Sequence, residues 1–127
     1  TFENRFDLVL FCEILEHTLV DPRHYMNCIA RMLSQDGKLI VTTPNVFSLH
    51  NKEAFSRGLN IFEWYSPHGP HGRHNRLWSL NEMIRVPQMH AWGLKPISIC
   101  TENAAAPAER GDDTEGDTMF CVYEREQ

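Results

Sequence analysis

The chain has 127 residues, of which 42% are hydrophobic and 23% are charged, and its formal net charge is −5. A chain of this size is expected to form one domain with its own core, and its composition is that of an ordinary globular protein. No apolar run reaches the roughly 18 residues that a membrane span needs, and the negative charge argues against a general nucleic-acid-binding surface.

Four cysteines lie far apart and form no Cys-x-x-Cys pair: Cys12, Cys28, Cys100 and Cys121. Each stands among apolar neighbours, which favours buried free thiols over a disulfide or a zinc site. The first residues lack the pattern of a secretion signal, so a cytoplasmic location is expected.

Two short apolar runs predict strands of a parallel sheet. FDLVLF, residues 6–11, and KLIVTT, residues 38–43, are the kind of run that is buried on both faces. Between them the sequence predicts a helix with Asp21 as N-cap, Pro22 at the first helical position and Gly37 just past its end. A strand, a helix and a second strand in this order form a right-handed crossover, so the two strands should be parallel.

The next segment, residues 44–78, shows no regular period and is rich in His, Asn, Ser, Gly and Pro. A long run of this kind in a compact domain is usually an active-site lid or a binding loop. SLNE, residues 79–82, is a capping-box pattern that opens a helix with Gly93 as its stop, and Pro87 should kink or split this helix. Three apolar residues are predicted to lie in the core: Met83, Ile84 and Trp92.

Two last runs, ISIC at residues 97–100 and MFCVY at residues 119–123, predict strands. The linker of residues 102–117 is alanine-rich, then acidic and glycine-containing, and is expected to be mobile. Since no helical pattern separates the two strands, an antiparallel hairpin at a sheet edge is the simplest arrangement.

Polar side chains follow the first strand. If a helical turn begins there, Glu13, Glu16 and His17 fall at i, i+3 and i+4 and share one face. They would lie at the carboxyl edge of the parallel strands, where open α/β sheets bind ligands. The alternative is that Glu16 and His17 cap the turn and bond to backbone groups.

An ordered set of motifs carries a resemblance. FDLVLFCEILEH…DP followed by LSQDGKLIVTTPN is similar to the second half of class I S-adenosylmethionine-dependent methyltransferases, especially the ubiquinone-type O-methyltransferase branch. GRHNRLWSLNEM and HAWGLKPISI also look like later motifs of this family. The resemblance covers roughly residues 6–101. It implies an α/β, Rossmann-like methyltransferase fold, with residues 1–127 as the C-terminal half of a single domain.

One departure from the family is large. Its members hold the cofactor mainly through a glycine-rich turn after the first strand and an acidic residue ending the second. The seven glycines here form no G-x-G-x-x-G, and the chain begins about where the family's fourth strand begins. The first three strands are therefore expected to be absent. Residues 6–11 would form an exposed apolar edge, which predicts a homo-oligomer, pairing with an N-terminal piece, or poor stability of the chain alone.

The resemblance also implies roles for single residues. The chain would take part in methyl transfer from S-adenosylmethionine to an oxygen of a small-molecule or glycan-like acceptor. Cys12 and Glu13 would line the methionine end of the cofactor, and His17 or Glu13 would remove the acceptor's proton. Three residues are expected at the acceptor: Asn45, His74 and Arg76. A turn formed by Pro44 and Asn45 explains that corner equally well.

A divalent metal ion is a further hypothesis. Glu13, Glu16 and His17, with His74 as the fourth ligand, would offer carboxylate oxygens and imidazoles to an ion that lowers the pKa of a bound hydroxyl. This spacing looks like the magnesium site of small-RNA 2′-O-methyltransferases, although relatives acting on small molecules share it. RNA 2′-O-methylation is therefore one alternative, and a non-catalytic, truncated or degenerate homologue that binds a partner through its sheet edge is another.

Overall fold

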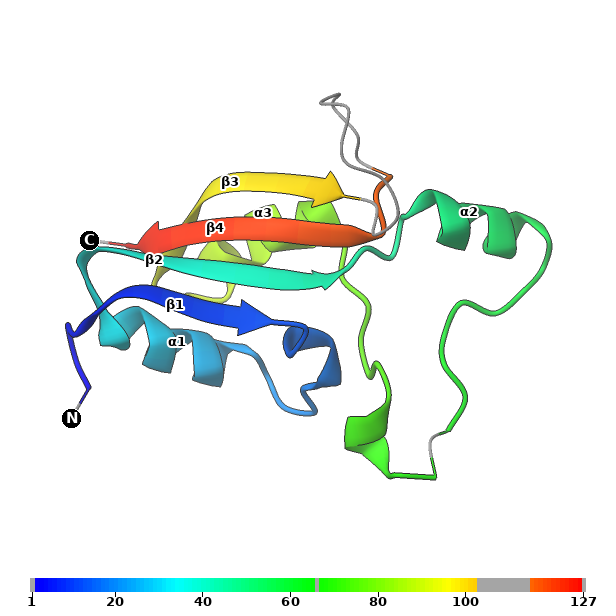
Figure 1. Ribbon diagram of the computed structural model, residues 1–127, viewed down its shortest axis with the longest axis horizontal. Coiled ribbons are helices and arrows are strands. Elements are labelled where there is room, and N and C mark those ends of the chain that lie inside the picture. Colours follow the sequence, from blue (N-terminus) through cyan, green and yellow to red (C-terminus); the bar gives the residue numbers. More distant parts are fainter. Residues whose placement is uncertain (1, 66, 103–114, 127) are drawn as a thin grey trace.

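The computed structural model describes residues 2–65, 67–102 and 115–126, without the side chain of His71, and these form one four-stranded sheet (Figure 1). The strands are β1 (Phe6–Cys12), β2 (Leu33–Pro44), β3 (Leu94–Glu102) and β4 (Thr118–Arg125), in the order β1-β2-β4-β3. The parallel pairing of β1 with β2 and the antiparallel hairpin of β3 with β4 are both as predicted. Because β4 lies between β2 and β3 and runs antiparallel to both, the sheet is mixed.

The helices are α1 (Arg23–Met32), α2 (Leu49–Ser56) and α3 (Leu80–Met89), with two short 3₁₀ turns, η1 (Leu15–His17) and η2 (Pro70–Gly72). None of the helices in the described ranges is long and apolar enough to cross a membrane.

The core lies between one face of the sheet and the helices α1 and α3. Alternate residues of β2 and β4 face it, and α1 and α3 add apolar side chains to the same cluster; among these buried residues are Met26, Ile29, Leu39, Val41, Met83, Met119, Cys121 and Tyr123. The predicted core positions Met83 and Trp92 are fully buried. The prediction for Ile84 is wrong, because this side chain, one position further around α3, is 48% exposed.

The opposite face of the sheet is open to solvent over β1. Leu8 and Leu10 are 53% and 60% exposed, so the prediction that this strand is buried on both faces is wrong for the described residues. β1 is an edge strand of the described sheet, as predicted. On the same face a charged row crosses three strands, where Glu124 accepts from Lys38 and Lys95 at 3.0 and 2.8 Å.

The predicted ends of the first helix need two corrections. α1 begins one residue later than expected, with Pro22 as the N-cap residue, while the Asp21 carboxylate accepts from the Arg23 N–H at 2.8 Å. Gly37 does not end the helix, which stops at Met32. It lies in β2, where a Cβ would come within 2.7 Å of the Phe6 carbonyl oxygen. Close approach of β1 therefore requires this glycine.

The segment of residues 44–78 is not structureless, because it contains α2 and η2. Ser48 is the N-cap of α2, and its Oγ accepts from the Asn51 N–H. This helix has no buried residue and extends beyond the end of β2 (Figure 1), so no apolar period reveals it in the sequence. The linker expected to be mobile, residues 102–117, lies mostly outside the described residues.

All four cysteines are free thiols, as predicted. Their expected burial is wrong for two of them, because Cys12 and Cys100 are exposed on the open face and at the sheet edge. Cys121 is fully buried, and this burial raises the pKa of its thiol to about 12.

Helix α3 runs without a break through Pro87. The predicted capping box is present at its start, with Ser79 and Glu82 exchanging hydrogen bonds. Proline has no N–H, so the Met83 carbonyl lacks its usual partner four residues later. The Tyr123 hydroxyl of β4 donates to this carbonyl at 2.8 Å. A side chain of the sheet thus satisfies the acceptor that Pro87 leaves open.

Replacing Tyr123 with Phe should lower the free energy of unfolding by about 1–3 kcal/mol, because the buried Met83 carbonyl then loses its donor. The same replacement should cost less in a Pro87→Ala background, since an alanine there supplies the helical N–H. Urea unfolding of the four proteins, followed by circular dichroism, measures the coupling. Tyr65→Phe, at a ring that is 88% exposed, is the control. Equal costs in both backgrounds would contradict this role for the hydroxyl.

Candidate functional site

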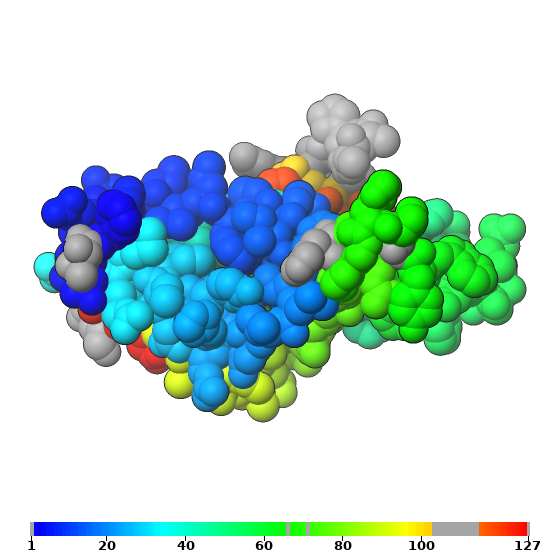
Figure 2. Space-filling model, turned by 90° about the horizontal axis from the view of Figure 1, so that it is seen from below, coloured from blue at the N-terminus to red at the C-terminus, as the bar shows by residue number. Residues whose placement is uncertain are grey.

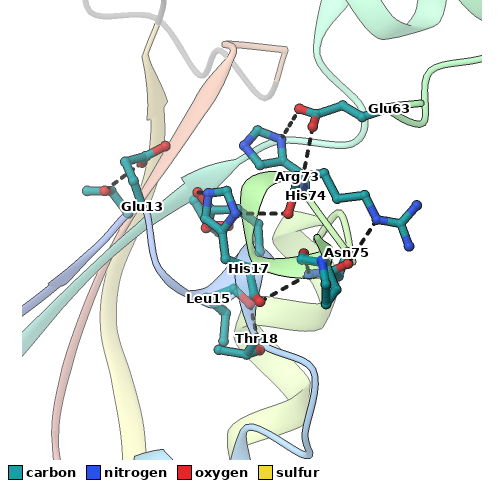
Figure 3. A network of polar contacts seen from close by, with 12 residues as sticks. Glu13, Leu15, His17, Thr18, Glu63, Arg73, His74 and Asn75 are labelled. Atoms are coloured by element: carbon teal, nitrogen blue, oxygen red, sulfur yellow. Dashed lines mark hydrogen bonds and ion pairs between the residues drawn. The ribbon is translucent and has the colours of Figure 1, made fainter. Parts of the chain in front are cut away.

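The turn after β1 places Glu13 at the rim of the sheet. Glu13 has a φ of 53°, a left-handed conformation that is uncommon outside glycine. Its N–H donates to the Thr42 carbonyl, and its carboxylate accepts from the Thr42 hydroxyl at 2.7 Å. The chain then enters η1, which Leu15 anchors with a fully buried side chain. Glu13 is consequently held against β2, and Figure 3 shows it apart from His17 and His74.

Glu16 is a buried carboxylate. Its side chain is 0% exposed, and its Oε2 accepts from the Thr43 hydroxyl at 3.0 Å. Its other oxygen, Oε1, is buried without a hydrogen-bond partner among the described residues. Burial in a poorly solvated site raises the pKa of this carboxyl group. Oε1 therefore needs a proton or a cation.

His17 lies beside this oxygen, with Nε2 at 3.9 Å from Glu16 Oε1. Its Nδ1 is 2.9 Å from the Arg73 carbonyl oxygen. Since a carbonyl can only accept, Nδ1 carries the hydrogen in this contact. Nε2 is then the nitrogen of His17 that can offer a lone pair.

The segment of residues 73–76 docks onto η1 through backbone groups (Figure 3). The Glu16 carbonyl accepts from the N–H groups of Asn75 and Arg76, and the Asn75 side chain donates to the His17 carbonyl. This docking brings His74 next to His17, with ring centroids 4.9 Å apart. Residues from two distant parts of the chain thereby form one site.

Glu63 contacts His74 from the other side. Its Oε1 lies 3.1 Å from His74 Nδ1, and its Oε2 accepts from the His74 backbone N–H at 3.1 Å. Both residues also line a cavity of about 190 Å³, whose other walls are Pro44, Asn51, Ile61, Phe62 and Leu77.

Three of the four proposed metal ligands come together. Glu16, His17 and His74 each offer one donor atom, and these atoms lie within 4.8 Å of one another. One carboxylate oxygen with two imidazole nitrogens suits a divalent transition metal ion. Among the described residues, Glu13 is not part of this group. The positive φ of Glu13 breaks the helical spacing on which the four-ligand prediction rested.

The other predicted residues lie around this group. Cys12 is exposed at the end of β1. Asn45 is 1% exposed, and its amide donates to the Gly116 carbonyl and accepts from the Phe47 N–H. Arg76 pairs with Glu82 at 2.6 Å and stacks on Trp78. The contacts of Asn45 and Arg76 are therefore structural in this conformation.

Sequence reasoning missed Thr43, Glu63 and Asn75 as parts of the site. Thr43 ends the predicted strand, two residues before Asn45, so a hydroxyl reaching a buried carboxylate could have been considered. Glu63 is a single acid in an irregular segment, eleven residues before His74. No spacing rule connects two such positions.

One protein family matches the chain. It is described as "Methyltransferase domain", and its profile covers residues 2–99. No curated protein matches the chain.

Several solved structures share the fold. A SAM-dependent methyltransferase from Thermotoga maritima, named as a possible histamine N-methyltransferase, is 17% identical with a TM-score of 0.64, over 98% of this chain and 57% of its own. A complex of the Haloferax volcanii Trm112 methyltransferase activator and a protein assigned as a methyltransferase gives 17% identity, a TM-score of 0.61, and coverages of 98% and 56%. A TehB-like SAM-dependent methyltransferase from Corynebacterium glutamicum is 14% identical with a TM-score of 0.51, over 97% of this chain and 49% of its own. At these identities the likeness concerns the fold alone, and the chain spans about half the length of these structures.

Thr43→Val should lower the free energy of unfolding by about 1–3 kcal/mol, because the buried Glu16 carboxylate loses its side-chain donor. Thr42→Val is the matched control: its hydroxyl bonds to the exposed Glu13, which water can solvate instead, so its cost should stay below about 1 kcal/mol. Urea unfolding compares the two variants. If Thr42→Val lowered the free energy of unfolding as much as Thr43→Val, the burial of Glu16 would not explain the loss of stability.

Proposed function

The chain belongs to the methyltransferase domain family, and from this premise we propose that it takes part in S-adenosylmethionine-dependent methyl transfer to an oxygen nucleophile. Its α/β fold is a partial Rossmann-like methyltransferase fold. The family supports S-adenosylmethionine as the methyl donor. The ubiquinone-type branch stays a prediction.

The observation that carries the proposal is the group of Glu16, His17 and His74 at the carboxyl ends of β1 and β2. Open α/β sheets bind their ligands at this edge. The group combines a buried carboxylate with an imidazole whose Nδ1 is already engaged. Such an arrangement can receive a proton from a bound hydroxyl group.

His17 is the proposed general base. A hydroxyl acceptor must lose its proton as its oxygen attacks the methyl carbon, and His17 Nε2 can take that proton. The Arg73 carbonyl holds the ring in the required tautomer, and the carboxylate of Glu16 stabilises the resulting imidazolium. Glu13 is the second candidate base, because its carboxylate is exposed at the same rim.

Cys12 and Glu13 are the residues proposed to meet the cofactor. S-adenosylmethionine supplies a methyl group activated on a sulfonium sulfur. Cys12 is the last residue of the edge strand β1, Glu13 follows it, and both are exposed, so they fit the family's use of these positions. The sequence lacks the glycine-rich turn that would hold the rest of the molecule. The proposed contacts of Cys12 and Glu13 therefore concern only the methionine end of S-adenosylmethionine.

A divalent metal ion is a second proposal for the same group. Glu16 Oε1, buried without a hydrogen-bond partner among the described residues, fits a ligand oxygen, and His17 and His74 would supply imidazole nitrogens. The ion would bind a hydroxyl acceptor and lower its pKa. With Nε2 of His17 bound to metal, His17 could not also act as the base. The two proposals therefore exclude each other at His17 Nε2, which either takes the proton or binds the metal ion.

The acceptor, the partners and the location of the protein are proposed only in general terms. The proposed small-molecule or glycan-like acceptor would approach the site beside the cavity of about 190 Å³ that His74 lines. The exposed edge of β1 could pair with a second copy or another strand. A cytoplasmic location remains a proposal. Neither RNA 2′-O-methylation nor a non-catalytic role is favoured by the comparisons.

The first test uses S-adenosylhomocysteine and the longest form that the natural reading frame encodes. This protein should bind the compound in calorimetry, and Glu13→Ala should weaken binding by about tenfold, the equivalent of about 1.4 kcal/mol. Glu3→Ala, at an exposed carboxylate before β1, is the control. Unchanged affinity in Glu13→Ala would remove Glu13 from the cofactor site, and absence of binding by the intact protein would refute the cofactor proposal.

The second test is a calorimetric titration of Mg²⁺, Mn²⁺ and Zn²⁺ into the same protein. One of these ions should bind, and His17→Ala should weaken binding beyond the about 10- to 100-fold expected for an outer-shell change, because a ligand is lost. His24→Ala, on the exposed surface of α1, is the matched control. No heat of binding with the intact protein would end the metal proposal.

A further inference from the structure

Glu63 has no role in the proton or metal proposals above, although its carboxylate contacts His74 at two points. Both of its carboxylate oxygens contact the same residue: Oε1 the imidazole Nδ1 and Oε2 the backbone N–H, each at 3.1 Å (Figure 3). A carboxylate bound at two points to one residue restricts both the ring and the backbone of that residue. The contact is thus specific to His74.

The contact favours one hydrogen position on the ring. An ionised carboxylate has no hydrogen to offer, so a lone pair on His74 Nδ1 would face a negatively charged oxygen at 3.1 Å, and a hydrogen on Nδ1 is favoured instead. Nε2 is then the nitrogen that can offer a lone pair to a cation. Histidine residues that bind metals commonly donate their other N–H to a carboxylate or a backbone carbonyl, which fixes the tautomer and raises the basicity of the ligand.

The two histidines of the group are held in the same way by different partners. His17 Nδ1 is hydrogen-bonded to the Arg73 carbonyl at 2.9 Å, and His74 Nδ1 lies 3.1 Å from a Glu63 carboxylate oxygen in an ion-pair contact. Arg73 and His74 are adjacent in the docked segment. In each ring Nδ1 therefore has a partner, and Nε2 is the other nitrogen that can offer a lone pair.

The contact contributes little to folding. The Glu63 and His74 side chains are 46% and 30% exposed, and exposed ion pairs add about 0–1 kcal/mol to stability. The fold holds the segment of residues 73–76 by separate backbone bonds to Glu16. Glu63 can thus be changed without loss of the fold, which separates a positioning role from a structural one.

We propose that Glu63 is a positioning residue that sets His74 in the Nδ1–H tautomer and so makes Nε2 its metal-binding nitrogen. This inference rests on the proposed metal function of Glu16, His17 and His74. It adds a residue that acts through His74 and does not itself bind the ion.

The test uses the longest natural form of the protein, labelled with ¹⁵N in its histidine rings. Without metal, at a pH where the rings are neutral, the intact protein should show His74 with hydrogen on Nδ1. Glu63→Ala should move His74 toward the Nε2–H tautomer, which free imidazole side chains favour in water. His17 should keep its signals, because the Arg73 carbonyl is untouched. Glu53→Ala, at an exposed carboxylate of α2, is the matched control.

The second readout is the affinity for Mn²⁺, which Glu63→Ala should weaken by about 10- to 100-fold with an unchanged urea midpoint. A His74 that keeps its tautomer in Glu63→Ala overturns the inference, and so does a changed tautomer with unchanged affinity. If the intact protein binds no Mn²⁺, the metal proposal and the ligand part of this inference both fail. The tautomer measurement, made without metal, then still decides whether Glu63 positions the ring.

Discussion

The buried carboxylate of Glu16 constrains the whole site. A carboxylate taken out of water needs hydrogen bonds or a positive charge, and one hydroxyl from β2 supplies only one of its oxygens. The other oxygen faces the His17 imidazole at a distance too long for a hydrogen bond. A proton or a cation at this point would satisfy it. The same residue also anchors the chain, because its carbonyl receives two N–H groups of the segment that carries His74. The side chain and the backbone of Glu16 thereby connect the end of β2 to the segment of residues 73–76.

Helix α3 links this anchor to the core. The segment that carries His74 leads directly into the capping box of α3, and the position of α3 on the sheet therefore limits where this segment can lie. Pro87, in the last turn of α3, would weaken a free helix. Here the Tyr123 hydroxyl takes the place of the missing N–H and ties the helix to β4. The Met83 carbonyl, which Pro87 leaves without a helical partner, thus makes a contact with the sheet. This contact stabilises the position of α3 on the sheet.

Those parts of the structure that depend on local pattern could be predicted from the sequence. The apolar runs gave both strand pairings, and the capping box gave the start of α3. The position of Gly37 could not be interpreted correctly, because its requirement comes from a carbonyl of another strand. Helix α2 has no buried face and leaves no apolar period. In the site, Glu16, His17 and His74 were predicted together. Glu13 was misplaced because a positive φ cannot be read from its neighbours, and Glu63 was missed because its partner is distant in sequence.

The proposed roles fall unevenly on the described residues. The proton-removal and metal proposals both depend on one group of side chains, a buried carboxylate and two imidazoles whose donor atoms lie within 4.8 Å of one another. Cofactor binding in this fold depends mainly on backbone N–H groups of a glycine-rich turn, and the sequence contains none. Glu13 lies between the proposed cofactor and acceptor residues, because it follows the last residue of β1 and its carboxylate accepts from Thr42, the neighbour of Thr43. The exposed face of β1 and the group of Glu16, His17 and His74 therefore meet at the turn after β1. Under the proposed function, the methyl donor and the acceptor would approach each other there.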